Sequence, residues 1–377
     1  MSSPRLLPAA AASTLLALTL IPASPAVAAP GCGKGTLHLV ASPLTAKERA
    51  VNGADALRPD SLTLAGYIDK TFDLDPIIVR WNGSVLRRER VRERQVGRDA
   101  EFDDVTVLKG GAGWAVGHYQ TDEGERALIR TRVNRVWRVT DPPPLRGRST
   151  LNGAVDASST DNVWAVGYQR GGRRPAVIRW NGDRWRTMRI PRIEGADRHV
   201  ALGVDAVSRK NVWISTTFTK NGVTRARVYH WNGEKFRPHV LPQPSDSLNI
   251  PNAIAVGSPT NIWVAGQHLE GVVTVPTFWH YDGDTWTHIA GPTVSGESHQ
   301  IADATVVKGR LLAVGEADDG GPVALLIRST VGGTDLTTGA PTGDPGELSA
   351  IGVAEGTNVA AAGGSFGGTL IAYSNCS

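Results

Sequence analysis

A motif of about fifty residues recurs along almost the whole chain, and such self-similarity restricts the available architectures more than any local feature. The stretch NVWAVGYQRGGRRPAVIRWNGDRW at 162–185 has relatives at 211–236 and 261–286. Each contains an aromatic-rich apolar segment, a polar stretch, a second apolar segment, an Asn-Gly or Asp-Gly pair and a last aromatic segment. The chain therefore consists of repeated small units.

The residue that closes the first apolar segment of each unit marks the period. These marker residues are Gly66, Gly117, Gly167, Ser215, Gly266, Gly315 and Gly363. The intervals between them are 51, 50, 48, 51, 49 and 48 residues. Seven units of this length account for residues 29–377 and predict a single domain.

Each unit contains four short β-rich segments. In the third unit they are 152–158, 162–168, 176–182 and 184–190, and apolar residues alternate within them as expected for strands. Asn181-Gly182, Asn232-Gly233 and Asp282-Gly283 lie before the fourth segment and suit a tight two-residue hairpin turn. Four-stranded antiparallel units repeated in this way predict an all-β fold, a seven-bladed β-propeller.

The repeated tryptophans have a structural explanation in such a fold, because stacked blades bury large apolar side chains against their neighbours. We predict packing between blades for Trp164, Trp180, Trp185, Trp213, Trp231, Trp263, Trp279 and Trp286. The alternative is a set of stacking platforms for carbohydrate. The even spacing of the tryptophans favours packing.

The two ends of the chain are predicted to share the last blade. The seventh unit stops after GTLIAY (368–373), and GTLHLVA (35–41) precedes the first unit as a spare strand. If this N-terminal strand pairs in the last blade, it closes the ring and brings Cys32 near Cys376. We expect a disulfide between them in an exported protein. The alternative is lipidation of Cys32.

Residues 1–28 are predicted to be a signal peptide. They contain Arg5, an apolar run through Leu20, and small residues at Ala26 and Ala28 that suit cleavage after Ala28. The run is too short and interrupted to span about 30 Å of hydrocarbon. We therefore expect a secreted, extracellular protein without a membrane span.

The net charge of +4 gives no reason to expect a nucleic-acid partner. Basic residues cluster at 87–98 and 170–192, which suggests either a polyanion site or a solvated face. Glu89 and Glu93 interrupt the first cluster, so the solvated face is favoured.

The WAVG…RWNG…W pattern over about residues 33–376 resembles blades of secreted bacterial propellers that are loosely grouped with kelch and galactose-oxidase-like domains. The resemblance implies a fold and a central channel with ligands at its mouth. The copper site of galactose oxidases needs an internal Cys, whereas both cysteines here lie near the ends of the sequence. Asp boxes of sialidases, G-x-S-x-G, HExxH and P-loop motifs are absent from the sequence.

Polar residues recur where the first strand of a blade should begin. Asn52, Asp103, Asn152 and Asn252 hold this position, and Asp55 and Asp156 follow a few residues later. Oxygen donors that converge on one axis could hold Ca²⁺ or sugar hydroxyls. The alternative is a water-filled channel in which these groups satisfy strand ends.

Two histidines offer a second candidate site. His199 and His299 precede the first strand of the fourth and sixth units, and an acid follows each of them, Asp205 and Asp303. Such residues suit a metal or acid–base site. His118 shows no ligand spacing, so the predicted site excludes it.

Two functions remain open on the sequence. The first is a secreted, monomeric, non-catalytic binding propeller for a glycan, a cell-envelope component or a protein, with no cofactor unless Ca²⁺ binds. The second is an exported hydrolase or lyase acting on a glycan or natural product at the channel mouth. An enzyme should gather several ionisable side chains within hydrogen-bond reach, whereas a binding platform need not.

Overall fold

The computed structural model describes residues 38–40, 49–58, 61–70, 73–82, 85–91, 98–292, 298–318, 322–330, 333–338, 348–353, 359–365 and 368–374. They belong to one compact unit, Cys32–Ser377. The predicted signal peptide and the predicted Cys32–Cys376 disulfide lie outside the described residues. Within the described residues, no helix is long and apolar enough to cross a membrane.

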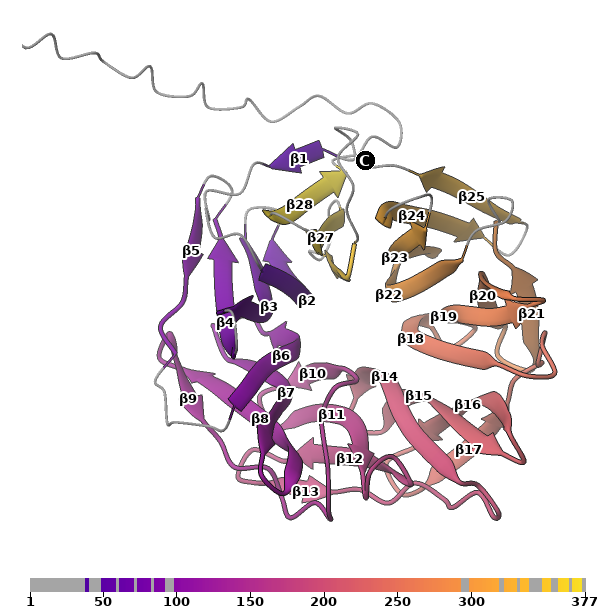
Figure 1. The fold of residues 1–377 in the computed structure, drawn as a ribbon, viewed down its shortest axis with the longest axis horizontal. Helices are drawn as coiled ribbons and strands as arrows, with labels where there is room; N and C mark the ends of the chain where they lie inside the picture. Colours follow the sequence, from indigo (N-terminus) through magenta and orange to yellow (C-terminus); the bar gives the residue numbers. More distant parts are fainter. Residues whose placement is uncertain are drawn as a thin grey trace, which may run out of the picture. The chain divides into compact units, whose positions relative to one another are not determined.

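All regular elements of the described segments are β-strands, and they form four-stranded antiparallel sheets (Figure 1). Sheet 1 consists of β2 (Arg49–Arg58), β3 (Ser61–Asp69), β4 (Leu74–Trp81) and β5 (Leu86–Arg88). Sheet 2 consists of β6 (Arg98–Val107), β7 (Gly113–Thr121), β8 (Gly124–Val133) and β9 (Val136–Val139). Sheet 3 consists of β10 (Val155–Ser159), β11 (Asn162–Gln169), β12 (Arg174–Trp180) and β13 (Trp185–Thr187).

The second half of the chain continues the pattern. Sheet 4 consists of β14 (Arg198–Ser208), β15 (Asn211–Lys220), β16 (Val223–Trp231) and β17 (Phe236–Val240). Sheet 5 consists of β18 (Asn249–Ser258), β19 (Asn261–Glu270), β20 (Val273–Tyr281) and β21 (Trp286–Ala290). Sheet 6 consists of β22 (His299–Val307), β23 (Arg310–Asp318), β24 (Pro322–Thr330) and β25 (Gly333–Thr338). The terminal sheet has the order β1 (His38–Val40), β28 (Gly368–Ser374), β27 (Val359–Ser365) and β26 (Ala350–Val353).

In sheets 1 to 6 the strands are neighbours in the order of the sequence, and the first strands of successive sheets contact one another. The contacts join β2 to β6, β6 to β10, β10 to β14, β14 to β18, and β18 to β22. The four strands predicted in the third unit are present, although β10 begins at Val155 rather than at residue 152 and β13 ends at Thr187 rather than at residue 190. This is a propeller-like, all-β fold of repeated four-stranded blades.

Turns that contain the Asn-Gly or Asp-Gly pair connect the third and fourth strands, but the predicted two-residue hairpin is wrong. Trp180 pairs with Trp185, Trp231 with Phe236 and Tyr281 with Trp286, so four residues form each loop. The Asn or Asp side chain of the pair stabilises the loop. In sheet 3 the backbone N–H of Asn181 donates to the Arg184 carbonyl, and Gly182 has a φ of 96°. The Asn181 Oδ1 atom accepts the N–H of Arg184 at 2.9 Å. Gly supplies the positive φ, and the side chain satisfies a backbone donor that the turn exposes.

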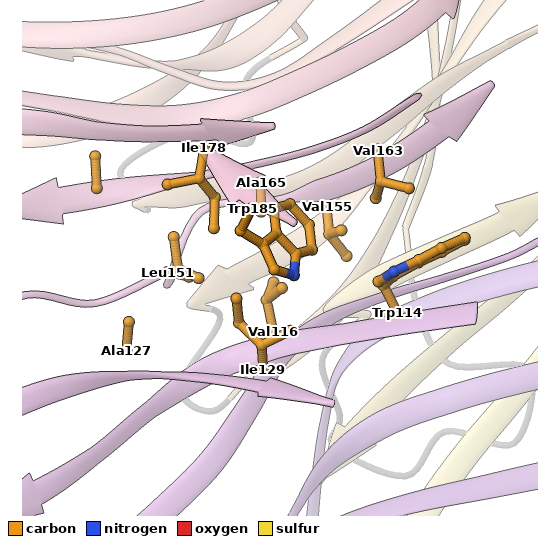
Figure 2. Close-up of a cluster of buried hydrophobic side chains, with 11 residues drawn as sticks. Trp114, Val116, Ala127, Ile129, Leu151, Val155, Val163, Ala165, Ile178 and Trp185 are labelled. Carbon is orange, nitrogen blue, oxygen red and sulfur yellow. The ribbon is translucent and has the colours of Figure 1, made fainter. Parts of the chain in front are cut away.

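Large apolar side chains fill the space between neighbouring sheets. Figure 2 shows one such cluster, in which Trp114 and Ile129 of sheet 2 meet Ile178 and Trp185 of sheet 3. On the other side of sheet 3, the ring of Trp164 lies 5.9 Å from that of Trp231 in sheet 4. The predicted packing of the repeated tryptophans between sheets is confirmed. Removing such a ring costs about 3–5 kcal/mol in typical cores.

The glycine that marks the repeat lies beside a β-bulge in the first strand. The bulges interrupt the registers of β2–β3, β6–β7, β14–β15, β18–β19 and β22–β23. A Cβ atom on Gly266 would lie 1.9 Å from the carbonyl oxygen of Ile250, and one on Gly117 would lie 2.1 Å from that of Glu101. The marker is glycine because the bulged strand leaves no room for a side chain there.

Sheet 4 corrects the sequence alignment by one residue. Thr216 pairs with Ala201 as Gly66 pairs with Val51 in sheet 1. The residue equivalent to the marker glycine is therefore Thr216, and the predicted marker Ser215 is wrong. With Thr216 the intervals on either side become 49 and 50 residues, so the repeat is more regular than the sequence alignment suggested.

Replacing Gly266 by alanine should destabilise the protein by about 1–3 kcal/mol, because the new methyl group collides with the Ile250 backbone. The urea midpoint of unfolding measures the effect. Thr216→Ala is the matched control: it keeps a Cβ at the equivalent position and loses the hydroxyl bond to the Arg227 carbonyl and the 3.4 Å contact with His199 Nε2. A Gly266→Ala midpoint equal to that of the native chain would contradict the close approach.

A carboxylate in the first strand joins most sheets to the next one. Each accepts a backbone N–H from the following sheet, and the donor–acceptor distances are as follows. They are Asp55–Val107 at 2.7 Å, Asp104–Val155 at 2.7 Å, Asp156–Ala206 at 2.6 Å, Asp205–Val256 at 2.8 Å and Asp303–Ile351 at 3.0 Å. Sheet 5 differs. Its Ala255 pairs with Trp263 as Asp205 pairs with Trp213 in sheet 4, and an alanine side chain cannot accept this hydrogen bond.

These carboxylates ionise less readily than exposed ones. Burial raises the pKa of Asp55 and of Asp303 to about 6. Burial, together with the charge of Asp156, also raises the pKa of Asp205 above its ordinary value. The folded state therefore retains protons that the unfolded state releases from about pH 3.8 upward, so this contribution to stability is full in acid and is lost as the pH rises through the raised pKa values.

Asp205→Asn should make the protein more stable than the native chain at pH 8, because the amide oxygen still accepts the Val256 N–H without an ionisation cost. The difference should shrink toward pH 4. Asp205→Ala should instead cost about 1–3 kcal/mol at pH 4, because it leaves that N–H without its acceptor, and less at pH 8, where it also removes the ionisation cost. Urea unfolding at the two pH values measures all three proteins. A constant difference between Asp205→Asn and the native chain would contradict the pKa argument.

Candidate functional site

One cluster of ionisable side chains lies at the start of the first strand of sheet 2. The His118 Nδ1 atom is 2.9 Å from Asp103 Oδ2, and its Nε2 atom is 3.2 Å from Glu101 Oε1. The three side chains keep 17–19% of their surface exposed. We call Glu101, Asp103 and His118 the His118 cluster.

The β-bulge of sheet 2 assembles this cluster. Glu101 on β6 is the cross-strand partner of His118 on β7, and the register then shifts between Phe102 and Asp104. The shift inserts Asp103 as an extra residue beside this pair. Gly117, next to His118, allows β6 to approach closely enough for these contacts.

Sheet 1 adds a further polar side chain. The Nδ2 atom of Asn52 donates to the Phe102 carbonyl at 2.9 Å and to Glu101 Oε2 at 3.4 Å. The adjoining Gly53 lets the two sheets come together, since a Cβ there would lie 2.4 Å from the Asp104 Cα. Asn52 therefore fixes the position of Glu101 from the neighbouring sheet.

The cluster holds a proton more tightly than its members would in water. Burial raises the pKa of Asp103 despite its hydrogen bond with His118, and burial and the charge of Asp103 raise the pKa of Glu101. Burial lowers the pKa of His118, but the hydrogen bond and charge of Asp103 and the charge of Glu101 outweigh it, so the pKa of His118 lies above 6.5. An incoming cation would compete with this proton.

The donor set could also hold a metal ion. One ligand atom from each member lies within 4.8 Å of the others, and no other group of this kind occurs among the described residues. Two carboxylates and an imidazole suit Zn²⁺ or a similar transition metal better than Ca²⁺, which takes oxygen ligands. A metal would have to displace the hydrogen bonds that His118 makes with Asp103 and Glu101.

Two of the sequence-predicted site residues, Asn52 and Asp103, meet at this cluster. Asn152 is exposed, and its Oδ1 atom accepts the Thr150 hydroxyl at 2.5 Å. Asn252 bonds to Gln267 in its own sheet and to the Ile301 carbonyl of sheet 6. The prediction that Asn152 and Asn252 contact a ligand stays a prediction.

Asp55 and Asp156 join neighbouring sheets through the backbone bonds described above. Their carboxylates thus have a structural task that the sequence pattern did not reveal. Their predicted contact with a ligand also stays a prediction.

His199 and His299 are buried, and the group of potential metal ligands includes neither of them. The ring of His199 packs against Phe218 and Tyr229, and its Nε2 atom is 3.4 Å from the Thr216 hydroxyl. Burial, followed by the charge of Arg227, lowers the pKa of His199 to about 4. This His is neutral in the core at neutral pH, which suits packing better than proton transfer.

Glu101 and His118 were missed by sequence reasoning, although a signal existed. His118 directly follows the marker Gly117, and Glu101 lies two residues before Asp103. Pairing the marker segment with the preceding strand would have placed them opposite each other. The bulge was needed to bring Asp103 to the same place.

Comparisons with known proteins identify the fold. The solved structure described as YCF48 bound to D1 peptide matches 92% of this chain and 99% of its own, with a TM-score of 0.56 and 14% sequence identity. At that identity the likeness shows a β-propeller-like fold alone. No protein-family model and no curated protein matches the chain. The kelch and galactose-oxidase-like resemblance therefore stays a prediction.

NMR titration should show that His118 loses its proton above pH 6.5. In Asp103→Asn the pKa of His118 should fall, because the substitution removes both the hydrogen-bonding carboxylate and its charge. Asn152→Ala, at the predicted equivalent position of sheet 3, should leave the titration unchanged. A native His118 that titrates below 6.5 would contradict the arrangement.

Proposed function

We propose that this chain is an exported binding protein built as a closed, seven-bladed β-propeller. Closure is supported by the antiparallel pairing of β1 with β28, in which His38 is opposite Tyr373, and by contacts of β26 with both β22 and β2. Export through a signal peptide of residues 1–28 and a Cys32–Cys376 disulfide complete the proposal from the sequence. Lipidation of Cys32 is the alternative to the disulfide.

The proposed ligand is a protein segment that presents a basic group to the His118 cluster. The cluster is the observation that carries this proposal: it places two carboxylates in partly exposed positions, and burial is the main cause of their raised pKa values. A cation that approaches them would stabilise their ionised forms. A Lys or Arg side chain would supply a positive charge and could donate hydrogen bonds to the carboxylate oxygens. YCF48, a propeller of similar fold, is described as bound to a peptide, which supports a peptide or protein ligand over a glycan or another envelope component.

Catalysis at the same cluster is the second candidate. Glu101 and Asp103 both lie within hydrogen-bond reach of His118, as general acid–base chemistry requires. Several ionisable side chains therefore lie within hydrogen-bond reach of one another, as expected of an exported hydrolase or lyase. Turnover of glycan substrates that is lost in His118→Gln would favour this candidate.

An array that displays glycans, neutral peptides and Lys- or Arg-containing peptides tests the binding proposal. The native protein should retain basic peptides, and Asp103→Asn should weaken that binding about tenfold or more, since it removes a partly buried charged partner. Asp183→Asn, which removes an exposed carboxylate in the loop between β12 and β13, is the control and should bind like the native protein. Retention of glycans alone, or equal binding by Asp103→Asn, would contradict the proposal.

Binding of the basic peptide should strengthen as the pH rises through the pKa of His118. Below that pKa, the imidazolium already compensates the carboxylates and opposes a second cation. Calorimetric titration at pH 6 and pH 8.5 measures the change, and His118→Gln should abolish most of it. Tighter binding at pH 6 in the native protein would be inconsistent with a cationic ligand.

A further inference from the structure

A second site lies where sheet 1 meets sheet 2, apart from the His118 cluster. It is a pocket of about 400 Å³ formed by the β4–β5 hairpin of sheet 1, the residues after β5, and the outer strands of sheet 2. Its lining is dominated by arginine: Arg80, Arg87, Arg88, Arg90, Arg132 and Arg135, with Asn82, Val85 and Glu89. It shares no residue with the His118 cluster.

The base of this pocket is held by a buried ion pair. Arg132 Nε and Nη2 each donate to a different oxygen of Glu89 at 2.9 Å, and these side chains are only 7% and 12% exposed. The indole N–H of Trp137 donates to the same carboxylate at 2.6 Å, and the backbone N–H of Trp137 donates to the Arg90 carbonyl. These bonds tie the segment after β5 to β9, so the position of the arginines is set by the fold.

The remaining arginines of the pocket have unbalanced charge. Among the described residues that line the pocket, Glu89 is the only acid, and Arg132 already neutralises it. Arg80 donates to the Ser61 hydroxyl, which carries no charge. Within the described part of the chain, no carboxylate forms an ion pair with Arg87, Arg88, Arg90 or Arg135. Five positive charges therefore face one pocket, and their mutual repulsion favours an anionic ligand.

We propose that this pocket binds a ligand that carries two or more phosphate groups. The guanidinium fork donates two parallel hydrogen bonds to phosphate oxygens, and arginine suits such recognition better than lysine. A single phosphate dianion would balance less than half of the five charges, whereas adjoining phosphates match both the charge and the size of the pocket. The sequence pattern alone favoured a solvated face, because it could not show that arginines from two sheets converge.

Calorimetric titration with tripolyphosphate and with inorganic phosphate tests the site and its preference. The native protein should bind tripolyphosphate more tightly than inorganic phosphate, and salt should weaken both. The double substitution Arg87→Gln, Arg88→Gln should weaken tripolyphosphate binding about tenfold or more, because charge-assisted hydrogen bonds are lost. Arg135→Asn should also weaken tripolyphosphate binding. Asparagine tolerates the φ of 63° at this turn residue, so this variant tests the site independently if the double variant misfolds.

The matched control is Arg186→Gln, Arg189→Gln, which removes two exposed arginines at and just after β13, the fourth strand of sheet 3. It should bind tripolyphosphate like the native protein. Equal losses in the control and in the Arg87, Arg88 variant would overturn the proposal, since they would indicate attraction to net charge. Unchanged binding in both pocket variants, or native binding no tighter for tripolyphosphate than for inorganic phosphate, would also overturn it.

Discussion

The bond from a first-strand carboxylate to a backbone N–H of the next sheet is the interaction on which the arrangement of sheets depends. A four-stranded sheet of this size exposes two apolar faces and cannot bury them alone. Tryptophan and aliphatic side chains supply the adhesion between sheets, but apolar contacts are non-directional. The carboxylates of residues such as Asp104 and Asp205 add a directional bond near the first strands, and so fix one sheet against the next.

The candidate site arises from the same region of the fold. The bulge that gives the first strand its irregular register also inserts Asp103 beside the Glu101–His118 pair. A regular strand would alternate its side chains between the two faces and would not add this third group at that point. The bulge thus recurs in several sheets for structural reasons. In sheet 2 it also forms the candidate site, because its extra residue is acidic and lies beside a histidine and its cross-strand partner Glu101.

Much of the fold could be predicted from the sequence, because strands, turns and packing tryptophans repeat with a steady period. The site could be predicted only in part. Asn52 and Asp103 were found by their position, but His118 was not, because a cross-strand partner depends on a register that a bulge has shifted. Asp55 resembled a ligand residue in the sequence, yet its carboxylate accepts a backbone N–H of the neighbouring sheet. No local pattern distinguishes an oxygen aimed at a ligand from one aimed at the adjacent backbone.

Ala255 makes the junction between sheets 5 and 6 chemically different from the others. There the Asn252 amide donates to the Ile301 carbonyl, and the first strand of sheet 5 offers no carboxylate. An amide does not titrate, so the Asn252 bond keeps its protonation state at a pH that changes the carboxylate bonds of the other sheets. The repeat is therefore uniform in shape but not in its chemical response: acidity changes the charge of the carboxylates that join most neighbouring sheets, whereas the amide bond between Asn252 and Ile301 carries no such charge.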